Sequence, residues 1–326
     1  MPLQLADLTI APPVLLAPLA GITDLPFRRL VASFGAGLVV SEMVASQEVV
    51  QASPMARARA ELGFDQAATA VQLAGREPHW MAEAARFVES QGARVIDINM
   101  GCPARKVTNG WSGSALMKDL DHALTLIDAV VAAVSVPVTL KTRLGWDDGL
   151  MNAPELARRA EAAGVAMVTI HGRTRCQFYT GSADWAAIGA VKRALRIPVI
   201  ANGDITGPLR AMQALAASGA DGVMVGRGAQ GRPWLLAQIA AALYGTPEPE
   251  VPQGDALADL VIGHYEAMLD FYGTALGLKV ARKHLGWYLE TAGLEAHRAA
   301  ILRDEVPAQV IAALRLAFGA QERAAA

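Results

Sequence analysis

Residues 198–228 read PVIANGDITGPLRAMQALAASGADGVMVGRG and contain the unit from which the fold is inferred. Two short runs, 198–201 and 222–225, are apolar throughout, as strands of a buried parallel sheet are. Between them, residues 208–218 have the apolar spacing of an amphipathic helix, and Gly219 stands where a helix commonly ends. A strand, a helix and a second strand in this order predict a βαβ unit.

The same alternation extends back to the N-terminus. Strands are predicted to begin near Val14, Leu38, Thr69, Val95, Val138, Met167, Val199 and Val223. Helices are predicted at 24–34, 78–90, 115–134, 153–163, 184–195, 208–218 and 233–244; residues 47–62 also have helical spacing, but Pro54 interrupts them. Eight strand–helix repeats in about 235 residues predict an α/β fold, a (β/α)8 TIM barrel, because a doubly wound sheet usually stops at five or six strands.

Composition separates a second region from the barrel. Residues 245–254 hold three prolines and no apolar period, as in a linker, and 255–326 have helical periodicity without a strand signal. We therefore expect the barrel at 1–244, a Pro-rich linker at 245–254 and a small helical domain at 255–326.

The overall composition excludes several classes of protein. An apolar fraction of 53% excludes intrinsic disorder, and a net charge of −2 excludes a chain that coats polyanions by bulk charge. Two cysteines cannot form a disulfide framework. With no signal-peptide pattern and no long apolar span, these features predict a cytoplasmic protein that does not enter a membrane.

Polar residues follow nearly every predicted strand, at the end where TIM barrels place their active sites. Asn202-Gly203-Asp204 and Gly226-Arg227-Gly228 follow the last two strands, where loops often bind phosphate through backbone N–H groups, although such glycines can also simply turn the chain. Lys141 ends an apolar strand and needs an anionic or polar partner: either the N1/O2 edge of a flavin or an acid such as Glu42 or Asp97.

His171 and Cys102 are the reactive side chains at these strand ends. A single strand-end histidine such as His171 is more often structural than catalytic, and no His-Glu-x-x-His spacing occurs, so no metal is expected. Cys102 lies in a Gly-Cys-Pro turn before basic residues, which suggests a thiol exposed to the cleft. It could be a nucleophile, a general acid or a buried small hydrophobe, whereas Cys176 is interpreted as incidental.

Six ordered motifs resemble the tRNA-dihydrouridine synthases. They are 18–24 (PLAGITD), 97–103 (DINMGCP), 140–143 (LKTR), 170–174 (IHGRT), 201–205 (ANGDI) and 226–227 (GR). Within that family the chain is most similar to the bacterial DusB branch, through 41–43 (SEM), 230–234 (QGRPW) and 281–284 (ARKH).

The resemblance implies an oxidoreductase that binds FMN. Its implied cofactor residues are Pro18, Leu19, Ala20, Gln72, Lys141, His171, Asn202, Gly203, Asp204, Gly226 and Arg227. It also implies reduction of a D-loop uridine in tRNA to 5,6-dihydrouridine with NADPH or NADH as reductant, hydride passing from flavin N5 to C6 and a proton from Cys102 to C5. For the DusB branch the implied position is uridine 17. The family usually has Met where Leu19 stands, a change of similar volume and little expected consequence.

Contacts to tRNA phosphates require local positive charge. The candidates are Arg105, Lys106, Arg143, Arg173 and Arg175 around the barrel mouth, and Lys279, Arg282 and Lys283 in the helical region. Solvated helix charge is the alternative interpretation. Two other functions stay open, an FMN barrel acting on a free small molecule and a non-catalytic RNA-binding regulator, and we expect a monomer.

Overall fold

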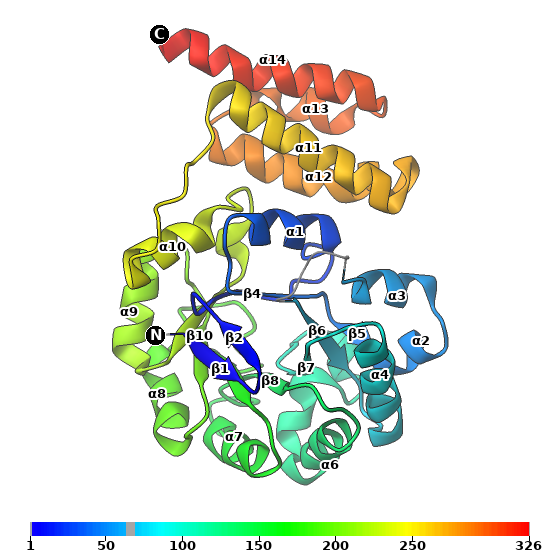
Figure 1. The fold of residues 1–326 in the computed structure, drawn as a ribbon, viewed down its shortest axis with the longest axis vertical. Helices are drawn as coiled ribbons and strands as arrows, with labels where there is room; N and C mark the ends of the chain where they lie inside the picture. Colours follow the sequence, from blue (N-terminus) through cyan, green and yellow to red (C-terminus); the bar gives the residue numbers. More distant parts are fainter. Residues whose placement is uncertain (1, 63–68, 326) are drawn as a thin grey trace.

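The strands pair in chain order, and the last pairs with the first. The computed structural model describes residues 2–62 and 69–325. In these two segments, eight parallel strands close a barrel: β3 (Val14–Leu16), β4 (Leu38–Val40), β6 (Thr69–Ala74), β7 (Val95–Met100), β8 (Val138–Arg143), β9 (Met167–His171), β10 (Val199–Asn202) and β11 (Gly222–Val225). β11 pairs with β3, with Val223 opposite Val14. The predicted TIM barrel is confirmed, and each strand begins within one residue of its predicted start (Figure 1).

Helices surround the barrel in the predicted order. They are α1 (Leu25–Ser33), α4 (Pro78–Ser90), α6 (Leu120–Val131), α7 (Ala153–Ala162), α8 (Trp185–Ala194), α9 (Pro208–Ser218) and α10 (Leu235–Tyr244). The single helix predicted at 115–134 is wrong: a 3-10 turn, η1 (Gly113–Lys118), precedes α6. The break lies at Asp119, whose carboxylate accepts a hydrogen bond from His122 N and so caps α6.

The interruption at Pro54 is confirmed. Residues 46–60 form two short helices, α2 (Ser46–Val50) and α3 (Pro54–Ala60), and a two-residue strand, β5 (Val44–Ala45), precedes them. Pro54 begins the second helix because the first turn of a helix does not need its missing N–H.

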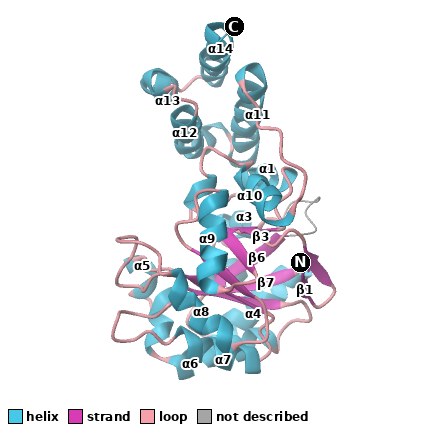
Figure 2. Cartoon of the chain, turned by 90° about the vertical axis from the view of Figure 1, so that its left-hand side faces the viewer, coloured by secondary structure: helices cyan, strands magenta, loops and turns pink. Residues whose placement is uncertain are grey.

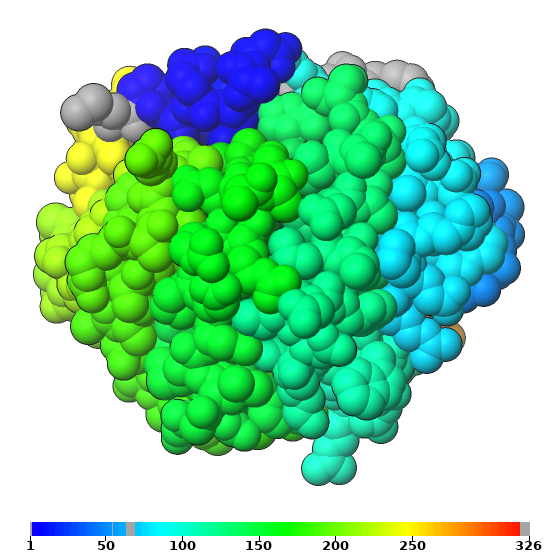
Figure 3. All heavy atoms as spheres, turned by 90° about the horizontal axis from the view of Figure 1, so that it is seen from below, coloured from blue at the N-terminus to red at the C-terminus, as the bar shows by residue number. Residues whose placement is uncertain are grey.

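An N-terminal hairpin covers one end of the barrel. Strands β1 (Leu3–Leu5) and β2 (Leu8–Ile10) pair antiparallel and lie across the strands in Figure 1. Leu5 and Ile10 are buried with Leu15, Val95 and Ile200, which stand near the amino ends of their strands. In Figure 3 the hairpin lies at the edge of the surface formed by the barrel helices. The hairpin does not cover the opposite end of the barrel, where the strands finish.

Residues 254–325 form a helical bundle beside the barrel. Its helices are α11 (Gly254–Tyr272), α12 (Thr274–Thr291), α13 (Arg298–Arg303) and α14 (Pro307–Ala325), with a short turn, η3 (Glu295–His297). The bundle has its own core, which includes Tyr265, Leu285 and Phe318. Figures 1 and 2 show it adjacent to α1 and α10. No helix in the described part of the chain is long and apolar enough to cross a membrane.

Aromatic side chains join the bundle to the barrel. The ring of Phe27 on α1 lies 5.7 Å from that of His264 on α11 and 5.1 Å from that of His284 on α12. The three side chains are all buried. The bundle is therefore packed on the barrel through an apolar contact in addition to the linker.

Candidate active site

A cavity of about 820 Å³ opens where the strands end. It brings together Cys102 and every residue assigned to a cofactor from the sequence: Pro18, Leu19, Ala20, Gln72, Lys141, His171, Asn202, Gly203, Asp204, Gly226 and Arg227. These residues lie in or shortly after seven of the barrel strands, β3, β6, β7, β8, β9, β10 and β11, whose ends the barrel topology brings together. Met43, Asn99, Arg143, Phe178 and Tyr179 also line the cavity.

A row of buried polar side chains leads from the barrel interior to Cys102. Thr139 Oγ1 and Gln72 Nε2 each donate to the Asp97 carboxylate at 2.6 Å. Asn99 Nδ2 donates to Gln72 Oε1 at 2.7 Å, and Asn99 Oδ1 accepts from Cys102 N at 2.9 Å. Burial raises the pKa of Asp97, against the lowering effect of these hydrogen bonds. The row fixes the Gln72 amide and the backbone before Cys102.

Asn99 is a site residue that the sequence prediction missed. Asn99 lies within the 97–103 motif, but the motif by itself predicts no role for it. Its spacing from Asp97 could have indicated a role in the site. Asp97 and Asn99 are two residues apart on β7, so both side chains face the same side of the strand.

Within residues 2–62 and 69–325, Lys141 has an amide partner and no carboxylate at ion-pair distance. Its ammonium donates to Asn202 Oδ1 at 3.1 Å, and among the described residues it forms no ion pair within 4 Å. Glu42 accepts instead from Gly21 N at 2.6 Å, and Asp97 bonds Gln72 and Thr139. Burial, together with nearby Arg143, lowers the pKa of Lys141 to about 8. The alternative of a direct salt bridge to Glu42 or Asp97 is therefore wrong.

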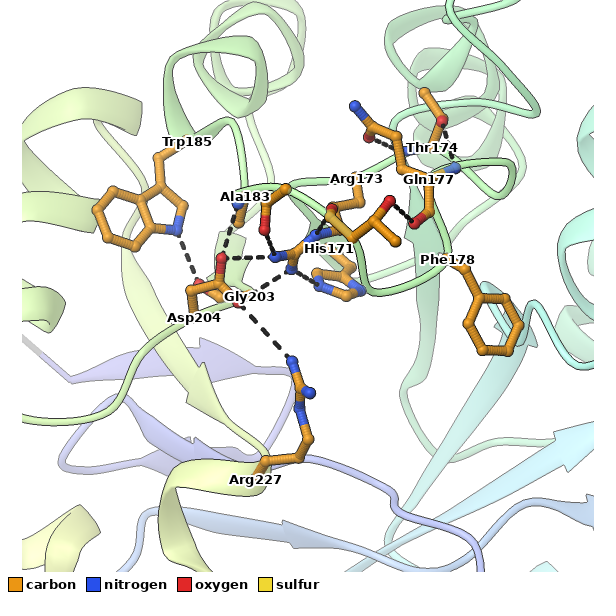
Figure 4. A network of polar contacts seen from close by, with 12 residues as sticks. His171, Arg173, Thr174, Gln177, Phe178, Ala183, Trp185, Gly203, Asp204 and Arg227 are labelled. Carbon is orange, nitrogen blue, oxygen red and sulfur yellow. Dashed lines mark hydrogen bonds and ion pairs between the residues drawn. The ribbon is translucent and has the colours of Figure 1, made fainter.

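His171, Arg173 and Asp204 form a second polar cluster, shown in Figure 4. Arg173 Nη1 and Nη2 donate to the two Asp204 oxygens at 3.0 and 2.8 Å, and Nη1 lies 3.3 Å from His171 Nε2. Because a guanidinium can only donate, Nε2 accepts and Nδ1 carries the proton of a neutral ring. Burial, with Arg143, Lys141 and Arg173 nearby, holds the pKa of His171 well below its usual value.

The Asp204 carboxylate forms hydrogen bonds and an ion pair within the protein. It accepts a further hydrogen bond from Ala183 N at 2.8 Å, and Arg227 lies 3.8 Å away. Although burial alone raises its pKa, the Arg173 and Ala183 hydrogen bonds hold the pKa of Asp204 below its usual value. Asp204 is thus an anchor for Arg173 and Arg227, and the Arg227 side chain is 57% exposed.

The Cys102 backbone is held on both sides. Its carbonyl accepts from Ser114 N at 3.1 Å and Ser114 Oγ at 2.9 Å. Gly113 has φ +60°, and a Cβ there would lie 2.8 Å from the Cys102 carbonyl oxygen, so the 110–114 turn requires glycine at this point. Cys102 itself is half-buried, whereas Cys176 is exposed and outside the cavity lining.

Two of the predicted RNA contacts are buried. Arg143 and Arg173 are each 2% exposed. Arg143 donates to the carbonyls of Gly101 and Thr174 at 2.9 Å, and Arg173 to those of Thr180 and Gly181 as well as to Asp204. Their burial does not fit the surface position expected from the sequence. Arg143 instead forms part of the cavity wall.

The other predicted cations lie in different surroundings. Arg175 stacks 4.7 Å from the Trp146 ring, Arg282 lies 3.5 Å from Glu305, and Lys283 donates to the Gly21 carbonyl. Arg105, Lys106 and Lys279 are exposed.

Two aromatic residues at the mouth were not predicted. Phe178 and Tyr179 are 42% and 47% exposed in the loop between β9 and α8. The guanidinium groups of Arg143 and Arg227 lie 5.5 and 5.0 Å from the Tyr179 ring. The signal in the sequence was an adjacent aromatic pair shortly after a strand end.

Within the described residues, no group of three or more His, Cys, Asp or Glu side chains could hold a metal ion.

The closed parallel barrel and its polar cavity define a TIM-barrel enzyme. A family model described as "Dihydrouridine synthase (Dus)" matches residues 15–315. The chain belongs to the dihydrouridine synthase family, as the sequence motifs predicted.

Curated relatives agree with this assignment. A "Probable tRNA-dihydrouridine synthase" of Rhodobacter capsulatus is 61% identical over 99% of this chain and 100% of that protein. The "tRNA-dihydrouridine synthase B" of Xanthomonas campestris pv. campestris is 48% identical over 98% and 96%, which supports the DusB-like branch. Among solved structures, histamine dehydrogenase from Rhizobium sp. 4-9 has a TM-score of 0.58 at 13% identity, covering 81% of this chain and 50% of that one; it is similar in fold.

Proposed function

We propose that this protein reduces a D-loop uridine of tRNA to 5,6-dihydrouridine, with FMN as cofactor and NADPH or NADH as reductant. The observation that supports it most is the cavity that places Lys141 and Cys102 around one space, with no carboxylate of the described part of the chain paired to Lys141. The names of the relatives, which describe action on tRNA, point the same way. The modified position we propose is uridine 17.

The cavity fits a flavin. A desolvated ammonium whose described partner is one amide oxygen can donate to the electron-rich N1/O2 edge of an isoalloxazine, and Gln72 and Asn202 add amide groups beside it. Pro18, Leu19 and Ala20 offer an apolar wall. Gly203, Gly226 and the exposed Arg227 provide backbone N–H groups and charge suited to a phosphate, with neutral His171 adding an Nδ1 donor.

The chemistry divides between cofactor and protein. A reduced flavin supplies hydride to a carbon of the bound pyrimidine. Cys102, whose thiol group lies in the cavity lining, supplies the proton for the neighbouring carbon. Asn99 and Ser114 hold the Cys102 backbone, which fixes the point from which the thiol projects.

A D-loop uridine must leave its stacked surroundings to enter this cavity. We propose that Arg105 and Lys106, which are exposed directly after Cys102, bind phosphates flanking the flipped nucleotide. Lys279 and Arg282 would contact the tRNA from the bundle. A cytoplasmic location and a monomeric state stay predictions.

Purified protein tests the proposal against the two other functions. Flavin is extracted and identified, and NADPH oxidation and dihydrouridine formation are measured with unmodified tRNA and with free uridine or orotate. Dihydrouridine in tRNA alone supports the proposal. Reduction of the free base without tRNA would favour a small-molecule reductase, and tRNA binding without flavin or reduction would favour a non-catalytic RNA-binding protein.

A further inference from the structure

Lys283 connects the helical bundle to the loop between β3 and α1, part of which lines the cavity. It lies on α12 and is half-buried, and its ammonium donates a hydrogen bond to the carbonyl of Gly21 in the loop between β3 and α1. Lys279, one helical turn earlier, is exposed. Two lysines of the same helix therefore have different surroundings, although charge and spacing alone made them equivalent candidates for RNA.

The Gly21 peptide is held from both sides. Its N–H donates to Glu42 Oε2 at 2.6 Å, and the Glu42 residue is 3% exposed. Gly21 has φ +70°, and a Cβ built there would lie 3.0 Å from Lys283 Nζ. Glycine is needed for the backbone conformation and leaves room for the lysine.

The loop transmits this contact to the cavity. Leu19 N donates to Thr23 Oγ1 at 2.9 Å, and Ile22 N and Thr23 N donate to the Leu19 carbonyl at 2.9 and 3.0 Å. Gly21 is thus inside a tight hydrogen-bonded turn. Pro18, Leu19 and Ala20, which precede it, line the cavity. A shift of the Gly21 peptide would move Leu19 and Ala20 with it.

We propose that Lys283 is a positioning residue: it orders the 18–23 loop on the apolar side of the flavin and makes the geometry of the cavity depend on how the bundle is docked. Lys283 is then not a phosphate ligand for RNA, and the bundle contributes to the cofactor site as well as to tRNA binding. The inference rests on the proposed flavin site, but its first test requires neither flavin nor tRNA.

The test compares Lys283→Met, which removes the donor at similar length, with Lys283→Arg, which restores one, and with Lys279→Met as a control on the same helix. In the flavin-free protein, amide hydrogen exchange of residues 18–24 is expected to speed up in Lys283→Met and to stay near wild type in Lys279→Met. FMN titration should show binding weaker by about three- to tenfold for Lys283→Met, the size of one net hydrogen bond. Lys283→Arg should recover most of that loss, and visible circular dichroism of bound FMN should change in the same order.

The salt dependence of tRNA binding distinguishes a positioning role of Lys283 from a role as a phosphate ligand. A positioning role predicts the same slope for Lys283→Met as for wild type, whereas a phosphate ligand predicts a slope lower by about one. Unchanged exchange in 18–24 would overturn the inference, and so would unchanged FMN affinity. If the Met variant fails to fold, Lys283→Gln, whose side chain is one atom shorter and uncharged, takes its place. Faster exchange in 18–24 with an unchanged salt slope would then support the inference, and unchanged exchange or a lowered slope would overturn it. If no variant and no wild type bound FMN, the proposed cofactor would fail, while the exchange result would still decide the role of Lys283.

Discussion

The Lys141 ammonium lies 3.1 Å from Asn202 Oδ1, at the junction of β8 and β10 with the cavity. Asn202 is itself oriented, since its Nδ2 donates to the Met224 carbonyl at 2.8 Å. The pair therefore presents a cation and its oriented amide partner to the same space. This arrangement leaves donor capacity on the ammonium, because an ammonium has three N–H groups.

Replacing Lys141 by methionine is expected to weaken FMN binding. One charge-assisted hydrogen bond in an enclosed site corresponds to roughly a ten- to hundredfold change in Kd. The pKa of Lys141 is lowered to about 8, so the ammonium is charged below that pH and loses its charge above it. Wild-type affinity for FMN should fall as pH rises through about 8, and Lys141→Met should not show this transition.

Fluorescence titration of FMN between pH 7 and 9.5 measures both effects. Lys118→Met is a suitable control, because Lys118 is exposed and its ammonium lies over Trp146, outside the cavity lining. An unchanged Kd in Lys141→Met would remove Lys141 from the cofactor site.

The buried histidine pair between barrel and bundle predicts loss of stability in acid. Burial lowers the pKa of His264 to about 3 and that of His284 well below its usual value, with Lys283 adding to the latter. Histidines in the unfolded chain titrate near 6.5, so below that pH the unfolded state binds more protons than the folded state. Each buried histidine then lowers the free energy of unfolding by about 1.4 kcal/mol for every pH unit below 6.5. Burial raises the pKa of neighbouring Asp24 to about 6. Between pH 6 and 4, its contribution to the stability of the fold therefore increases as the pH falls, opposite to that of the histidines.

A comparison of variants isolates the histidine contribution. In urea unfolding between pH 7.5 and 5, His284→Leu should lose less stability than wild type, while His297→Gln, at an exposed histidine of the bundle, should behave as wild type. Parallel curves for wild type and His284→Leu would contradict the expectation.

Exposed cations near Cys102 are expected to bind tRNA phosphates. Replacing both Arg105 and Lys106 by alanine should lower the slope of log K against log salt by about one to two and leave NADPH oxidation intact. Arg94→Ala is the matched control: Arg94 lies 3.3 Å from Asp7 of the N-terminal hairpin, at the other end of the barrel. Equal slopes for all three proteins would place the RNA elsewhere.

The strand positions, and the grouping of the proposed cofactor residues around one cavity, could be predicted because both depend on local pattern and topology. Apolar runs such as 223–225 mark buried strands, and in a closed barrel the residues that follow them share one end. What local pattern does not give is the direction of a long side chain. Arg173 lies two residues after His171, yet it turns inward to Asp204, and Lys283 turns to Gly21 while Lys279 faces solvent. Those directions depend on partners 31 and 262 residues away.

The decisive measurement for the proposed reaction is a map of dihydrouridine at each position of tRNA from the source organism. It compares strains with and without this gene, the latter complemented by wild type or by Cys102→Ala. Removal of a general acid costs about 10²- to 10⁴-fold in rate. Loss of dihydrouridine at one D-loop position, restored by wild type and not by Cys102→Ala, is the predicted result. Full restoration by Cys102→Ala would contradict the role of the thiol, and an unchanged map in the deletion strain would contradict the proposed substrate.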